Sequence, residues 1–160
     1  MNETKIMVSA CLLGVNCRYD GKSKPQPELK PQLEGRRIIA FCPECLGELP
    51  TPRLPAEIQK GDGAAVLAGE VLVLNREGED YTPQFKAGAE ATLRLYREHQ
   101  PELIICKANS PSCGFGKIYD GTFSGRLRTG DGVTAALLRA NGAVLCTEED
   151  VLQNKPKNNL

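Results

Sequence analysis

Four short runs of this chain are apolar at nearly every position, and they constrain the fold more than any other feature. The runs are KIMVSA at 5–10, RIIAF at 37–41, ELIIC at 102–106 and AVLC at 143–146. A strand with one face in water alternates apolar and polar residues, whereas a strand covered on both faces is apolar throughout. The runs therefore predict an α/β fold, a sheet of mostly parallel strands with helices on both faces.

Two segments that lead into these strands carry helix signals. Thr82 as the N-cap and Pro83 as the first helical residue predict a helix that continues to about Gln100. Residues 132–141 predict a second helix, and Gly142 follows it as a residue typical of helix C-termini. Because each helix reaches the next strand within a few residues, the order is that of βαβ units. We expect a Rossmann-like arrangement.

The chain is expected to form one domain. Its 160 residues suffice for a single hydrophobic core, and it contains no internal repeat or dividing linker. We expect a single α/β domain over residues 1–152 and a frayed tail over residues 153–160. Segment 71–75 suits a short hairpin or edge strand. Residues 47–65 and 114–130 are rich in proline or glycine, and long loops in a compact domain are often functional.

The interpretation of the seven cysteines depends on the cellular compartment. No apolar run approaches the ~20 residues of a membrane helix, and the first residues lack the features of a signal peptide. We therefore expect a cytoplasmic protein, in which structural disulfides are rare. The formal net charge of zero provides no general attraction for nucleic acid or membranes. Metal ligands, redox thiols and buried thiols remain as possible roles.

Cysteines follow three of the four predicted strands. Cys11 follows the first, Cys42 and Glu44 follow the second, and the third leads into a segment with Ser110 and Cys113. Since the carboxyl ends of parallel strands meet at one edge, where ligands bind, we expect these residues to converge. Clustered thiolates need a cation, which zinc or an iron–sulfur cluster supplies. Three protein ligands leave one metal position open for a substrate, preferably one with a soft atom such as sulfur.

Other interpretations of the cysteines remain open at this point. Cys106 and Cys146 lie in apolar runs and are expected to pack in the core, while Cys17 lies in a polar loop and is expected to bind no metal. Cys42 and Cys45 form a Cys-Pro-Glu-Cys motif, which also suits a redox dithiol. A thiol redox protein and a non-enzymatic metal- or cluster-binding module are therefore the alternatives to a metal-dependent enzyme.

Longer motifs cover most of the chain and resemble a known bacterial family. They are VSACLLGVNCRYDG, CPECLGELPTPRLPAEI, DYTPQFKAGAE, SPSCGFGKIYDGTFSG and GDGVTAALL. Together they resemble the thiouracil desulfurase family, long described as a domain of unknown function. The resemblance implies an α/β domain with a [4Fe–4S] cluster held by three cysteines, which fall on Cys11, Cys42 and Cys113. It places the family's acid/base pair on Glu44 and Ser110.

The resemblance also implies an activity. It predicts an iron–sulfur-dependent desulfurase, or desulfidase, that removes sulfur from a thiolated uracil base, nucleoside or nucleotide. The reaction is expected to be a hydrolase-like C–S cleavage by water without net redox change. The expected partner is a small thiolated pyrimidine, with neither a membrane nor a nucleic acid involved. Asp120 and Arg126, in the glycine-rich segment, are candidate polar contacts for this substrate.

Overall fold

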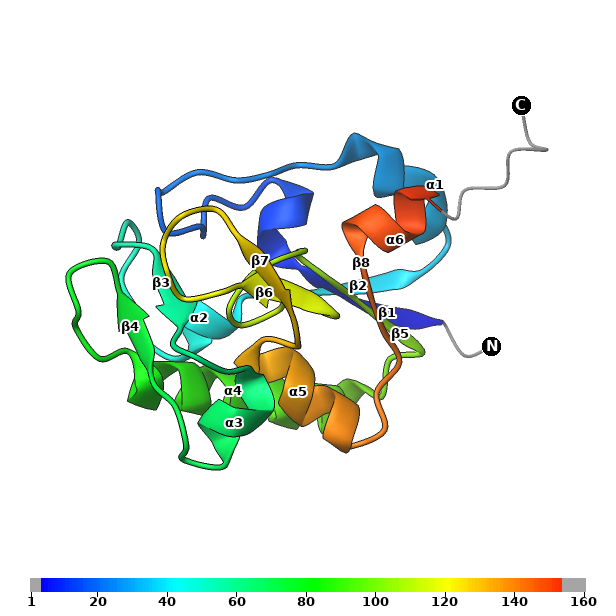
Figure 1. Cartoon of the computed structure of the whole chain (residues 1–160). Helices are drawn as coiled ribbons and strands as arrows, with labels where there is room; N and C mark the ends of the chain where they lie inside the picture. The colour runs from blue at the N-terminus through cyan, green and yellow to red at the C-terminus, as the bar shows by residue number, and fades with distance from the viewer. Residues whose placement is uncertain (1–3, 154–160) are drawn as a thin grey trace.

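The computed structural model describes residues 4–153 and has a four-stranded parallel sheet at its centre (Figure 1). Its strands are β1 (Lys5–Ser9), β2 (Arg37–Phe41), β5 (Leu103–Cys106) and β8 (Leu145–Thr147), in the order β2-β1-β5-β8. All neighbouring pairs are parallel. The four apolar runs therefore form the predicted sheet. The strand order reverses between β1 and β5, which makes this crevice the switch point where ligands bind in such sheets.

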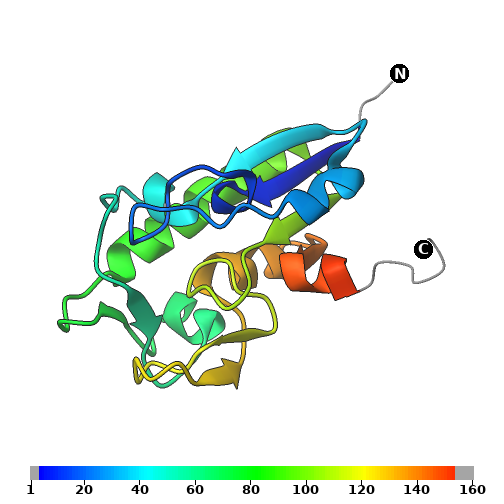
Figure 2. The ribbon, with the colours of Figure 1, turned by 90° about the horizontal axis from the view of Figure 1, so that it is seen from above.

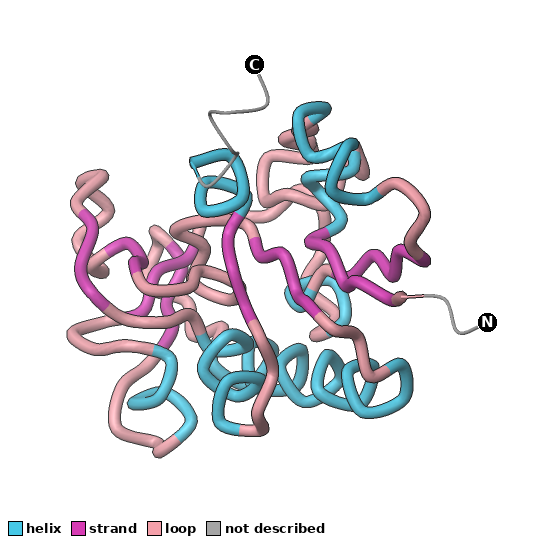
Figure 3. The backbone as a smooth tube through the Cα atoms, turned by 90° about the vertical axis from the view of Figure 1, so that its right-hand side faces the viewer, coloured by secondary structure: helices cyan, strands magenta, loops and turns pink. Residues whose placement is uncertain are grey.

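Helices cover both faces of the sheet (Figures 1 and 3). On one face, α4 (Thr82–His99) packs against α5 (Val133–Ala140). The other face carries short helices, which are η1 (Ala10–Leu13), η2 (Pro27–Leu29), α1 (Lys30–Leu33) and α6 (Glu148–Gln153). The expected fold class is confirmed. In the described part of the chain, no helix has the length and apolar character needed to cross a membrane.

The start of α4 differs in detail from the expectation. Thr82 does not cap the helix, because its hydroxyl accepts the backbone N–H of Val73 at 2.8 Å. The carboxylate of Asp80 instead accepts the backbone N–H of Thr82, also at 2.8 Å. Thr82 thus connects the helix to β4 (Val73–Asn75). Asp80 takes over the capping role, because it accepts a backbone N–H of the first turn that has no partner within the helix.

Two antiparallel strand pairs, called the two hairpins below although α3 lies between the strands of the first, are found beyond the carboxyl ends of the sheet (Figure 2). One pairs β3 (Ala56–Ile58) with β4, and the other pairs β6 (Lys117–Tyr119) with β7 (Leu127–Thr129). The remaining elements here are α2 (Pro43–Leu46) and α3 (Gly63–Leu67). Segment 71–75 contains one strand, β4, as expected for an edge strand, and it pairs with β3 from the other side of α3. The segments expected to be loops, 47–65 and 114–130, contain β3 and the pair β6 and β7. These strands were not predicted because each has only three residues and no long apolar run.

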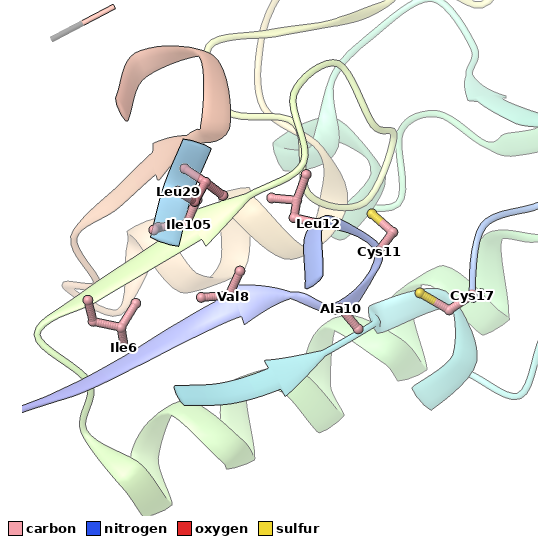
Figure 4. Close-up of a cluster of buried hydrophobic side chains, with 8 residues drawn as sticks. All are labelled: Ile6, Val8, Ala10, Cys11, Leu12, Cys17, Leu29 and Ile105. Carbon is pink, nitrogen blue, oxygen red and sulfur yellow. The ribbon is translucent and has the colours of Figure 1, made fainter. Parts of the chain in front are cut away.

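The core explains why the central strands are apolar throughout. Ile6 and Val8 of β1 pack with Ile105 and Leu29 on the face of the short helices, as Figure 4 shows. Met7 points to the opposite face, as the alternation of a strand requires, and packs towards α4 and α5. A third cluster ties the hairpins to the helices and consists of Leu49, Ile58, Val66, Val73, Phe85, Ala89, Ile118 and Val133. Of the expected tail at 153–160, residues 154–160 lie outside the described residues.

Candidate active site

A cavity of about 430 Å³ opens at the carboxyl ends of β1, β2 and β5. All three cysteines expected to bind a metal line it, from three different elements. Glu44 and Ser110 line it as well. The three expected metal ligands and the two expected acid/base residues therefore lie around one cavity. Its lining includes Ser9, Ala10, Cys11, Cys17, Phe41, Cys42, Glu44, Arg53, Glu57, Arg76, Lys107, Ser110, Ser112, Cys113, Tyr119 and Phe123.

Cys11 reaches the cavity from η1, directly after β1. The turn that follows ends at Gly14, whose φ of +93° lies in the left-handed region that favours glycine. The returning chain brings Cys17 back to the same place, where it is 7% exposed. Figure 4 shows Cys11 and Cys17 together at the end of the apolar cluster. Although Cys17 lies among polar residues in the sequence, it is buried, because this loop folds back onto the core. That it binds no metal stays a prediction.

The thiols in the cavity are close enough to perturb one another. A hydrogen bond with Cys11 raises the pKa of Cys17 to about 11. A hydrogen bond with Cys17, together with burial, raises the pKa of Cys42. Burial raises the pKa of Cys113 to about 12, and a hydrogen bond with Ser9 partly opposes this effect. Bare thiols in this setting are neutral, and a bound cation would favour their thiolate forms.

Cys42 and Glu44 are positioned by α2, a single turn that begins with Pro43. Cys42 is the N-cap residue, and α2 lies unusually close to α4. A Cβ atom on Gly47 would lie 2.0 Å from the backbone oxygen of Gln84, and one on Gly88 would lie 2.0 Å from that of Pro43. Two facing glycines therefore allow the close approach that sets the position of α2 in the cavity wall.

The carboxylate of Glu44 is held from both sides. Its Oε1 accepts a hydrogen bond from Nε of Arg53 at 3.3 Å and lies 3.2 Å from Nη2 of the same guanidinium in an ion pair. Its Oε2 accepts a hydrogen bond from the Ser112 hydroxyl at 3.1 Å. The Arg53 side chain is only 2% exposed and also binds the backbone oxygens of Cys17 and Pro50. Sequence reasoning missed Arg53 and Ser112. The PTPR and SPSC motifs contain them, but nothing in the spacing indicated a contact with Glu44.

Ser110 shapes the loop that presents Cys113. Its Oγ accepts the backbone N–H groups of Ser112 and Cys113, both at 3.1 Å, and lies 3.0 Å from the Ser112 hydroxyl oxygen. A continuous path of hydrogen bonds thus runs from Ser110 through Ser112 to Glu44. The loop is fixed against α5, because Val133 and Thr134 donate backbone N–H groups to the oxygens of Pro111 and Ser112.

The structure does not place Asp120 and Arg126 in the cavity lining. Arg126 is exposed, and the Asp120 carboxylate accepts hydrogen bonds from the backbone N–H and the hydroxyl of Thr122. The hydroxyl contact, followed by the backbone contact, lowers the pKa of Asp120. The same loop instead contributes Phe123 to the cavity, opposite residues of the other hairpin. A substrate role for Asp120 and Arg126 stays a prediction.

The remaining cysteines lie outside the cavity lining. Cys106 is 1% exposed in the core, as expected, and Cys146 is half-buried against the core. Cys45 is exposed, with its sulfur 3.7 Å from the Thr51 hydroxyl oxygen. Of the two cysteines in the Cys-Pro-Glu-Cys motif, Cys42 is therefore the one that faces the cavity.

The thiols of Cys11, Cys42 and Cys113 could hold either of two metal centres, a zinc ion or an iron–sulfur cluster. Within residues 4–153, no group of three His, Cys, Asp or Glu side chains is arranged around a single metal ion. In an iron–sulfur cluster each cysteine binds a different iron, so the thiols need only surround one shared cavity. Three thiols that line one cavity therefore fit a cluster better than a lone zinc ion.

The fold and the cavity define an α/β enzyme class with a thiol-lined site at the switch point of a parallel sheet. The chain belongs to the 2-thiouracil desulfurase family, whose model matches residues 6–150. The expected family is thereby confirmed, as is the expectation of an enzyme of this type.

Two relatives are similar over nearly their whole length. The chain is 43% identical over 146 residues to the uncharacterized protein YbbK of Bacillus subtilis (strain 168), which covers 91% of this chain and 97% of YbbK. It also resembles the solved structure of TudS, a [4Fe–4S]-dependent thiouracil desulfidase. That match has a TM-score of 0.79 and 40% identity, and covers 94% of this chain and 95% of TudS.

Proposed function

We propose that this protein replaces the sulfur of a thiolated uracil base, nucleoside or nucleotide with oxygen from water. Cys11, Cys42 and Cys113 hold a [4Fe–4S] cluster, and Glu44 and Ser110 move the protons. One observation carries the proposal: three thiols, from the segments that follow three neighbouring strands, line a single cavity beside a fixed carboxylate. The family membership and the similarity to a [4Fe–4S]-dependent thiouracil desulfidase support it.

Three cysteine ligands leave one iron of the cluster without a protein ligand. When bound, the cluster supplies a Lewis-acidic iron that favours soft sulfur ligands. The chain's own task is then to activate water and to deliver a proton to the departing sulfur. The overall reaction converts C=S and H₂O into C=O and H₂S, so electrons balance without an external oxidant or reductant.

Glu44 is suited to activate the water. Because Arg53 holds Oε1 through a hydrogen bond and an ion pair, Oε2, which the Ser112 hydroxyl contacts, is the oxygen that exchanges the proton. Water adds to the carbon that carries the sulfur, and Glu44 accepts the water proton. The Ser112 hydroxyl links Oε2 to Ser110, which gives the proton a path along the cavity wall. Ser110 then donates to the departing sulfur, and Glu44 returns to its charged form.

Anaerobic reconstitution followed by turnover assays tests the proposal. The reconstituted protein is expected to convert at least one of 2-thiouracil, 4-thiouracil and 4-thiouridine, with the desulfurised base or nucleoside and sulfide released in equal amounts. Cys113→Ser is expected to lose both iron and turnover. Cys146→Ser is the matched control and is expected to retain both, because Cys146 lies outside the cavity lining.

Two results would contradict the proposal. A protein that holds its cluster but converts no thiolated pyrimidine would be a cluster-binding module. A protein that is active without iron, and that requires both Cys42 and Cys45, would be a thiol redox protein. Quantifying iron, sulfide and product in the same samples separates these outcomes.

A further inference from the structure

The wall of the cavity formed by the two hairpins carries a carboxylate that the proposed chemistry does not use. Glu57 of β3 lines the cavity and is 8% exposed. We propose that Glu57 accepts a hydrogen bond from a ring N–H of the substrate and thereby selects pyrimidines that are unsubstituted at that nitrogen. The inference rests on the proposed function, since it specifies how the same cavity recognises its substrate.

The hydrogen bonds of Glu57 leave one of its oxygens for a ligand. Oε1 accepts the backbone N–H groups of Gly121 at 2.9 Å and of Phe123 at 3.1 Å. Within residues 4–153, no donor binds Oε2 and no Lys or Arg forms an ion pair with Glu57. Oε2 of Glu57 is not among the fully buried side-chain atoms without a partner in that range, so it keeps some exposure. Because Glu57 lines the cavity, we take this exposure to be towards the cavity.

An ionised carboxylate can only accept hydrogen bonds. A carboxylate that is nearly buried and unpaired is costly unless a donor reaches it, and such groups cluster at functional sites. Thiolated uracils carry ring N–H groups that can donate in the plane of the base. The chemistry of Glu57 therefore matches the proposed substrate, whereas it would repel an anionic group such as a phosphate placed at the same point.

The loop held by Glu57 adds an aromatic surface beside the carboxylate. Phe123 lines the cavity in a left-handed conformation with φ of +56°, which is uncommon for a residue with a side chain. A Cβ atom on Gly121 would lie 2.5 Å from the backbone oxygen of Ile58, so the loop is pressed against β3. The guanidinium of Arg76 lies 5.8 Å from the centre of the Phe123 ring. An aromatic ring beside an in-plane acceptor suits a planar base.

The test combines one variant with a set of ligands. Glu57→Gln keeps the size of the side chain and a carbonyl oxygen for Gly121 and Phe123, but presents an amide N–H₂ or a neutral oxygen to the ligand. Glu77→Gln is the matched control, since Glu77 is exposed and does not line the cavity. Uracil, 1-methyluracil and 3-methyluracil are the ligands, because they cannot react and lack the sulfur that would bind iron.

Binding is measured by calorimetry on the reconstituted protein. Loss of a hydrogen bond to a charged acceptor is expected to weaken uracil binding by about tenfold to a hundredfold in Glu57→Gln, and not in Glu77→Gln. In the unsubstituted protein, methylation of one ring nitrogen is expected to weaken binding by a similar factor. Glu57→Gln is expected to bind that methylated ligand and uracil equally, because the contact is already lost. In turnover assays KM rises by the same factor while kcat stays within about threefold.

The outcomes separate this inference from the proposed function. If the protein converts thiouracils but Glu57→Gln binds uracil as tightly as the unsubstituted protein, the inference fails and the proposed function stands. If no thiolated base is converted but uracil binding still depends on Glu57 and on one N–H, the proposed function fails and the inference stands. Should Glu57→Gln not fold, equal binding of all three ligands to the unsubstituted protein would by itself overturn the inference.

Discussion

The close approach of α2 and α4 provides a sharp test of how the fold positions the site. Gly88→Ala adds one carbon at a point 2.0 Å from the backbone oxygen of Pro43. Ordinary contact for such an atom begins at 3.4 Å, so α2 and α4 have to separate by about 1.4 Å. The residues that move with α2 are Cys42 and Glu44, one a proposed ligand and the other the proposed base.

Two opposing effects set the expected magnitude. Replacing glycine by alanine within a helix stabilises it by about 1 kcal/mol. Overpacking a tight contact typically costs about 1–3 kcal/mol, so the net change in the free energy of unfolding is a loss of about 0–2 kcal/mol. Activity is expected to respond far more strongly, because a misplacement of about 1 Å can cost about a hundredfold in rate. Gly88→Ala should therefore fold but lose turnover by about a hundredfold, or lose iron.

The assay measures urea unfolding, iron content and turnover on the same preparations. Ala87→Gly is the matched control, because Ala87 is the exposed neighbour of Gly88 in the same helix. It is expected to lose about 1 kcal/mol of stability through lower helix propensity while it retains iron and turnover. The two variants thus separate helix stability from site geometry. Turnover and iron content of Gly88→Ala equal to those of the unsubstituted protein would refute the reasoning.

Four further predictions concern single side chains. Glu44→Gln should retain iron and lower kcat by about 10²–10⁴-fold, and unchanged turnover would mean that Ser110 or water moves the proton. Arg53→Ala should reduce the free energy of unfolding by about 3–5 kcal/mol in urea titrations, because it leaves Glu44 as a partly buried unpaired charge, while Arg53→Lys should lose less. Single serine variants should retain iron after reconstitution at Cys17, Cys45, Cys106 and Cys146, and loss of iron in Cys17→Ser would identify a further ligand. Burial, and after it the charges of the nearby Asp150 and Glu148, raises the pKa of Cys146 to about 11, so this thiol is protonated at pH 8. The rate of its alkylation, measured by mass spectrometry, should therefore increase with pH up to about that pKa.

Sequence reasoning succeeded where one physical cause produces a repeated signal. Strands β1 and β5 lie buried inside the sheet, and the edge strand β2 is half-buried at Ile38 and Ile39, so the apolar runs of all three are visible in the sequence alone. Parallel pairing then brings their carboxyl ends to one edge, and this alone predicted that Cys11, Cys42 and Cys113 would share a cavity. This prediction depended only on the order and direction of the strands, and it required no knowledge of contacts between side chains.

The residues that the sequence did not indicate lie in segments with no periodic pattern of apolar residues. Cys17 and Arg53 lie in loops whose paths depend on tertiary packing, so the sequence did not indicate that both would be buried at the cavity. Asp120 and Arg126 were selected from the composition of a glycine-rich segment. In a hairpin loop, however, an Asp side chain readily binds its own backbone, as Asp120 does at Thr122. Composition indicated a loop that lines the cavity, but could not say which of its side chains does so, and a substrate role for Asp120 and Arg126 stays a prediction.

The two cavity carboxylates share a feature that links the fold to the proposed chemistry. In Glu44, Oε1 is bound by Arg53, and in Glu57, Oε1 is bound by two backbone N–H groups of one loop. In both cases Oε1 fixes the carboxylate. Oε2 then serves the proposed chemistry: in Glu44 it accepts the Ser112 hydroxyl that leads to Ser110, and in Glu57 it has no donor within residues 4–153. A group held in this way needs no reorganisation when the substrate arrives, which is the condition under which electrostatic stabilisation is most effective. Glu44, beside the thiols, would then move protons, and Glu57, on the wall formed by the hairpins, would orient the ring of the substrate.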